Sequence, residues 1–156
     1  MFVIMLASEI ISKLEKTIFK KYFAGIFSRD NIPRNLKDKH FIILNTDIKS
    51  GVGLHWYTVV RVNDLIECFD SLGIRDDQKN FICSNFNFKG ISHVTFNTTQ
   101  IQPSVSTLCG QYVLFYLFER YHNLDLEFDE LVNIIFSEQL SKNDETVVTF
   151  MNEFLN

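Results

Sequence analysis

The sequence predicts an α+β fold in which a central, mostly antiparallel sheet packs against a buried helix, with further helices at both termini. Two patterns support this: apolar runs of strand length lie in the middle of the chain, and helical apolar spacing marks its two ends. The length of 156 residues suits a single domain, 1–156, that buries its own core. The 16 phenylalanines indicate aromatic packing in that core.

The N-terminal part is predicted to form one helix and one strand. From Ser8 onward, apolar residues recur at helical spacing until Gly25, whose flexible backbone suits a helix end. Residues 41–44 form a short apolar run before a polar turn, which is typical of a buried strand.

A β-hairpin is predicted next. Residues 55–62 and 65–69 are rich in aromatic and β-branched side chains, and a two-residue link at 63–64 separates them. A modest helical stripe covers 74–86, and the alternation over 91–97 indicates another strand.

The C-terminal part is predicted to be helical. Residues 109–121 are apolar nearly all round, which describes a helix buried on most of its faces. A further helix is expected around 131–135, and 147–154 carry apolar residues at i, i+3, i+4 and i+7 for a last one.

Charge and cysteine content limit the partners that we expect. The formal charge of −4 comes without a block of basic residues, so nucleic-acid binding is not expected. No run approaches the roughly 20 apolar residues of a membrane span. Cys68, Cys83 and Cys109 are odd in number and lack metal-ligand spacing, so we expect no cofactor, no metal and a reducing intracellular compartment.

Cys109 is a candidate nucleophile. It lies where a loop turns into the buried helix, so the helix dipole and the unpaired N–H groups would favour its thiolate. Gly110 next to it would let a substrate backbone approach closely. A cysteine before an apolar helix is, taken alone, more often an inert core residue.

His55 and Asp70 are candidates for the base and its orienting group. His55 opens a strand after a glycine-containing loop, where a side chain can stand at the end of a sheet. Asp70 ends the next strand of the hairpin, so strand pairing could bring its carboxylate beside the imidazole. The alternatives are a strand histidine bonded to backbone and a turn-forming aspartate.

Gln102, on the loop that leads to Cys109, could donate its amide to an oxyanion together with the Cys109 backbone N–H. Gln100 is the competing choice. Either glutamine could instead be a solvent-exposed loop residue.

The order His, Asp, Gln, Cys resembles that of adenain, the adenovirus endopeptidase, and the wider clan of SUMO and ubiquitin-like proteases. The segment 41–46 leading to His55 and Trp56 is similar to the adenain segment before its histidine, and 22–25 is similar to its N-terminal motif. The seven-residue gap from Gln102 to the cysteine also matches. Residues 69–73 look more like the SUMO-protease branch, because adenain generally has glutamate where Asp70 stands.

The resemblance implies a thiol peptidase with His55 as base, Asp70 orienting it, Cys109 as nucleophile and Gln102 in the oxyanion hole. It also implies that Trp56, Gly53 and Gly110 contact the substrate, and that cleavage occurs beside small residues such as glycine. The expected function is processing of virion or capsid precursor proteins by a monomer, with a polypeptide substrate, a possible activating peptide and possible packaging in the virion.

Three other functions remain open from the sequence. A deconjugating protease for SUMO or ubiquitin-like proteins is the first alternative. An acetyltransferase with a similar residue set and an inactive module that binds polypeptide tails are the others.

Overall fold

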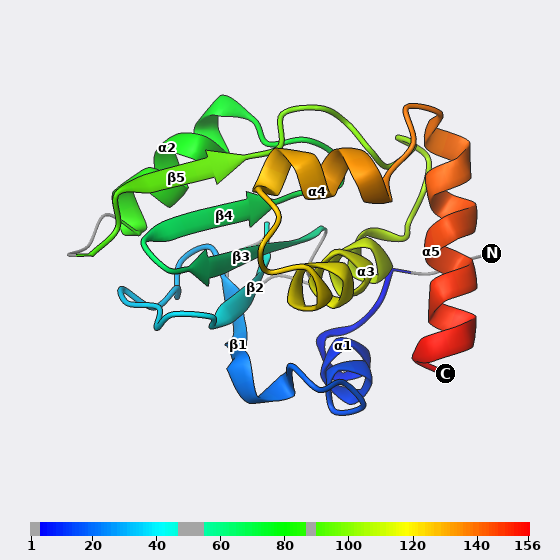
Figure 1. Ribbon diagram of the computed structural model, residues 1–156, viewed down its shortest axis with the longest axis horizontal. Helices are drawn as coiled ribbons and strands as arrows, with labels where there is room; N and C mark the ends of the chain where they lie inside the picture. Colours follow the sequence, from blue (N-terminus) through cyan, green and yellow to red (C-terminus); the bar gives the residue numbers. More distant parts are fainter. Residues whose placement is uncertain (1–3, 47–54, 87–89) are drawn as a thin grey trace.

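The computed structural model describes residues 4–46, 55–86 and 90–156. Its helices and strands follow the chain in an α+β order (Figure 1). They are α1 (Ala7–Leu14), a 3-10 turn (Lys20–Tyr22), β1 (Phe23–Ser28), β2 (Phe41–Asn45), β3 (Trp56–Val62), β4 (Leu65–Phe69), α2 (Asp76–Asn85), β5 (His93–Phe96), α3 (Cys109–His122), α4 (Phe128–Ile135) and α5 (Leu140–Phe154).

The five strands form one sheet in the order β1-β2-β3-β4-β5. The central pairs β2–β3 and β3–β4 are antiparallel, whereas the outer pairs β1–β2 and β4–β5 are parallel. The sheet is therefore mixed, not mostly antiparallel as expected. The β4–β5 pair is parallel because α2 carries the chain back across the sheet, as a parallel connection requires.

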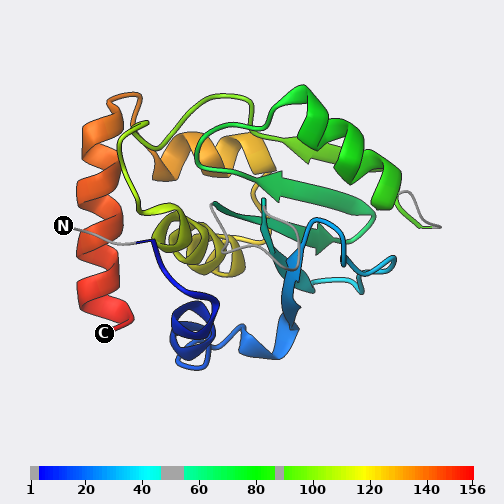
Figure 2. The ribbon, with the colours of Figure 1, turned by 180° about the vertical axis from the view of Figure 1, so that it is seen from behind.

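Helices cover both faces of the sheet (Figures 1 and 2). The helices α1, α3, α4 and α5 pack on one face, and α2 packs on the other. Strand β2 contributes to both cores, because Phe41 and Ile43 face the α3 side while Ile42 and Leu44 face the α2 side. A strand covered on both faces reads as a continuous apolar run, which is why it was visible in the sequence.

The N-terminal helix is shorter than its apolar spacing predicted. It ends at Leu14, where both the backbone N–H and the hydroxyl of Thr17 donate to the Leu14 carbonyl, at 2.9 and 2.7 Å. The buried Phe19 then stacks on Tyr121, with ring centroids 5.0 Å apart. Gly25 ends no helix but lies within β1 at a positive φ of 134°, beside an irregularity in the pairing with β2.

None of the helices in the described ranges is long and apolar enough to cross a membrane.

Candidate active site

The hairpin of β3 and β4 brings His55 and Asp70 together at one edge of the sheet. Because the two strands are antiparallel, with Thr58 opposite Phe69, the start of β3 lies beside the end of β4. His55 directly precedes β3 and Asp70 directly follows β4. The His55 Nε2 atom lies 2.6 Å from Asp70 Oδ1. The structure thus places the proposed base against the proposed orienting carboxylate.

Asp70 is fixed by several hydrogen bonds besides that to His55. Gln78 donates from Nε2 to Oδ2 at 2.9 Å, and the Leu72 N–H donates to Oδ1 at 2.9 Å. The Asn97 side chain pairs with the Asp70 backbone, accepting from its N–H at 2.9 Å and donating to its carbonyl at 2.6 Å. Such a carboxylate has little freedom to turn away from the imidazole.

The turn after Asp70 depends on a glycine. Gly73 has a positive φ of 84° and donates its N–H to the Asp70 carbonyl at 2.9 Å. A Cβ at this position would lie 2.7 Å from the Thr98 carbonyl oxygen. Backbone atoms cannot yield easily, so any side chain here would displace the turn that carries Asp70.

The environment of His55 favours the imidazolium. Burial lowers its pKa, but hydrogen bonds to Asp70 and Cys109 and the negative charges of both groups outweigh burial and raise the pKa from 6.5 to about 9. Since Nε2 is bonded to Asp70, Nδ1 is the ring nitrogen left to take the thiol proton. This is the pairing that an imidazolium–thiolate couple requires.

Asp70→Asn is expected to move the alkaline limit of activity to lower pH. Because the pKa of His55 is raised, the imidazolium is fully present below pH 6.5 and is lost as the pH rises through about 9. The negative charge of Asp70 raises the pKa of His55, so its removal should lower that pKa. The alkaline limb of the kcat/KM profile and the NMR titration of His55 should then both shift to lower pH. An unchanged limb in the variant would contradict this role for Asp70.

Cys109 is the first residue of α3, and it is 2% exposed. The preceding residue, Leu108, offers no side-chain hydrogen bond to cap the helix. The first N–H groups and the positive end of the helix dipole are therefore directed at the sulfur region. Cys109 thus combines a position at the start of a helix with an interaction with His55.

The other two thiols lie in different settings. Cys68 is wholly buried in the core on the α2 side, and burial raises its pKa well above the ordinary range. Cys83 is exposed on α2. Of the three cysteines, Cys109 is the one in contact with His55.

Gln102 is buried beside the site, with its amide held at both ends. Its Oε1 accepts from the Ser71 hydroxyl at 2.6 Å, and its Nε2 donates to the Ser106 carbonyl at 2.8 Å. A carbonyl can only accept, so the amide nitrogen must face the segment that leads to Cys109. Gln100 instead braces the loop by donating to the Gln102 carbonyl at 2.8 Å.

Two of the expected substrate contacts are occupied by the chain itself. A Cβ on Gly110 would lie 3.1 Å from the Met5 side chain, so the close approach at this glycine is made by Met5. Trp56 is 4% exposed and donates its indole N–H to the Met5 carbonyl at 2.8 Å. These two positions thus support the N-terminal segment and do not form an open cleft wall. Gly53 lies outside the described residues.

The sequence analysis did not predict that Gln78 and Asn97 would contact Asp70. Gln78 had one local signal: its Oε1 accepts the Arg75 N–H at 3.0 Å, the backward contact of a helix-capping glutamine. Its second contact, with Asp70, joins α2 to the end of β4 and has no sequence signature.

Gln78→Ala is expected to lower kcat about tenfold with little change in KM, because a hydrogen bond to a buried carboxylate contributes on the order of 1.5–3 kcal/mol and only part of it acts on orientation. Asn80→Ala, an exposed substitution on the same helix, is the matched control. Steady-state kinetics of both variants test the prediction. An equal fall in kcat in both variants would show that substitutions on α2 act only by lowering the stability of the protein.

No metal-binding group of three or more His, Cys, Asp or Glu side chains occurs among residues 4–46, 55–86 and 90–156.

Comparisons with known proteins identify the fold through solved structures. No protein-family model matches the chain, and the sequence matches none of the curated proteins. Two crystal structures of the pS273R protease of ASFV (African swine fever virus) share its fold. The selenomethionine form is 16% identical and a second structure 17%, each with a TM-score of 0.61 over 99% of this chain and 68% of that protein.

The chain therefore has the α+β fold of a viral protease, which confirms the fold class expected from the sequence. The more specific resemblance to adenain stays a prediction.

Proposed function

We propose that the protein is a cysteine endopeptidase that cleaves beside glycine or another small residue in virion or capsid precursor proteins. The observation that carries this proposal is the position of His55, hydrogen-bonded to Asp70 and in contact with Cys109 at the start of α3. The shared fold with a protease of a virus supports the same reading.

The proposed chemistry has an acylation step and a deacylation step, and Asp70 orients His55 in both. Cys109 Sγ attacks the peptide carbonyl carbon while His55 holds the thiol proton, and the Cys109 N–H and the Gln102 amide donate to the oxyanion. The C–N bond then breaks, and His55 transfers the proton to the leaving amine. Water, deprotonated by His55, hydrolyses the thioester, which releases the acid and restores the thiol.

Burial of the site supports the preference for glycine. Cys109 is 2% exposed and the His55 side chain is 13% exposed, so a scissile residue has to approach through a narrow opening. A residue without a Cβ can bring its carbonyl closest to the sulfur.

The test is a set of peptides with a central Gly-Gly and matched peptides in which one glycine is replaced by alanine or valine. We expect cleavage of the glycine peptides and a stepwise loss with side-chain size. Ubiquitin-like proteins with a C-terminal electrophile are assayed in parallel. Rapid labelling by these probes, without cleavage of free peptides, would favour the deconjugating alternative.

We also propose that the protein acts in a reducing compartment of the host cell. All three cysteines are free thiols in the structure, and the cytosol and nucleus keep thiols reduced.

A further inference from the structure

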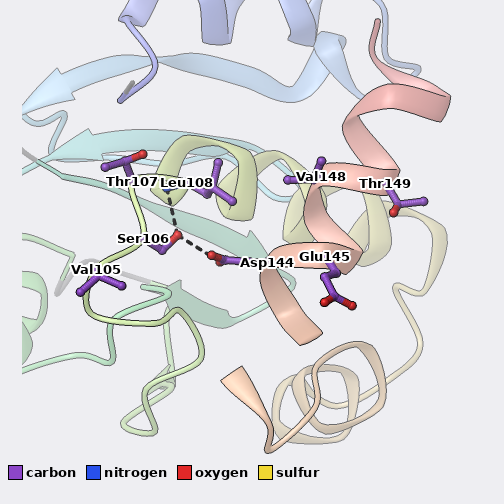
Figure 3. Close-up of a pocket in the computed structure, with 8 residues that line it drawn as sticks. All are labelled: Val105, Ser106, Thr107, Leu108, Asp144, Glu145, Val148 and Thr149. Atoms are coloured by element: carbon purple, nitrogen blue, oxygen red, sulfur yellow. Dashed lines mark hydrogen bonds between the residues drawn. The ribbon is translucent and has the colours of Figure 1, made fainter. Parts of the chain in front are cut away.

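A groove runs between the loop that precedes α3 and the helix α5 (Figure 3). Its volume is about 690 Å³. One wall is the loop and the other is α5, and the lining residues are Val105, Ser106, Thr107, Leu108, Asp144, Glu145, Val148 and Thr149.

Hydrogen bonds hold the two walls together. Asp144 Oδ1 accepts from the Ser106 hydroxyl at 3.0 Å and from the Tyr112 hydroxyl at 2.7 Å. These contacts tie α5 to the loop and to α3, so the groove is formed before any ligand arrives. A preformed site costs a ligand less ordering free energy.

The lining combines apolar and acidic groups. Leu108 and Val148 supply apolar surface, and Val105 at the rim is 94% exposed. The charged lining residues are the carboxylates Asp144 and Glu145, and neither takes part in an ion pair within the described ranges. A chain with a basic side chain next to an aliphatic one would complement this surface in charge and polarity.

The groove lies within reach of the proposed nucleophile. Leu108 lines it and is the chain neighbour of Cys109, so their Cα atoms are only about 3.8 Å apart. An extended polypeptide spans about 3.3–3.6 Å per residue, so residues one to three positions from the scissile bond could enter the groove.

We propose that this groove binds the stretch of polypeptide substrate that adjoins the scissile bond, and that its carboxylates select a Lys or Arg there. The inference rests on the proposed function. It adds a specificity site made of the loop before α3 and the face of α5 that is turned toward this loop.

The experiment compares kcat/KM for three forms of one cleavable glycine peptide. The minimal form ends close to the scissile bond, and the extended forms carry either Lys or Glu within three residues of that bond, on each side in turn. Wild type should prefer Lys to Glu on one side, and added salt should weaken the preference.

Glu145→Lys tests the groove directly, because Glu145 is exposed and its replacement leaves the walls tied through Asp144. The Lys-to-Glu preference should fall about fivefold, the scale of an exposed ion pair, while the minimal peptide is cleaved at the wild-type rate. Glu153→Lys, the same charge change on the same helix outside the groove, is the matched control and should keep the preference.

The outcomes separate the two proposals. Failure of the wild type to cleave the minimal peptide would overturn the proposed function. Cleavage of that peptide with no preference between Lys and Glu, or with a preference that Glu145→Lys and Glu153→Lys change equally, would overturn the groove proposal alone.

Discussion

Cys109→Ala is expected to abolish peptide cleavage while the protein stays folded. Removal of the nucleophile of a covalent mechanism lowers kcat by on the order of 10⁴-fold or more, because the remaining groups cannot form the thioester. The cost in stability should be small, about 1 kcal/mol, since alanine fills most of the space of a buried thiol. Peptide cleavage and thermal unfolding measure the two effects separately.

Thiol labelling provides the control for that variant. The exposed Cys83 would be alkylated whatever the mechanism, so the comparison is made in a Cys83→Ser background, which should retain full activity. The buried Cys68 should stay unlabelled in the native protein. Iodoacetamide should then modify Cys109 and abolish cleavage in parallel. Hydrolysis that persists in Cys109→Ala would mean that another group is the nucleophile.

Local sequence signals were sufficient for the part of the site that one hairpin builds. The two-residue link between the strands fixes the register, and that register brings the end of β4, which Asp70 follows, close to the start of β3, which His55 precedes. His55 and Asp70 could therefore be paired from the sequence. The helix at Cys109 could also be predicted, because its apolar residues continue all round it.

Contacts between distant segments could not be predicted in this way. Strand β1 has few apolar residues that alternate, and its parallel pairing with β2 comes from the tertiary fold. The same holds for Met5, which covers Gly110 and accepts a hydrogen bond from Trp56. Gly110 and Trp56 were expected to meet substrate because their residue types allow close contact, but residue type does not say which partner makes it.

Arg120→Met is expected to cause the largest loss of stability. Arg120 and Glu67 form an ion pair in the core, with Nη2 and Oε1 2.5 Å apart and side chains 2% and 1% exposed. Arg120 also donates from Nη1 to the Leu126 carbonyl at 2.7 Å, and Tyr116 donates to Glu67 at 3.1 Å. Methionine would leave the Glu67 carboxylate buried without its cation, at a cost of about 3–5 kcal/mol.

The double variant Glu67→Gln with Arg120→Met separates the ion pair from the loss of packing. It removes both charges, so it should recover most of the lost free energy of unfolding, as measured by urea denaturation.

Burial raises the pKa of Glu67, and Arg120 opposes that effect. Without the arginine the pKa should rise further. Because its pKa is raised in the folded state, folding favours the protonated form of Glu67. The loss in free energy of unfolding caused by Arg120→Met should therefore be smallest below about pH 4.5, and it should grow as the pH rises through the raised pKa. If Arg120→Met alone were as stable as wild type at neutral pH, the ion pair would make no net contribution to stability. Because β4 carries Glu67 and ends directly before Asp70, loss of the ion pair should also lower activity before the protein unfolds globally.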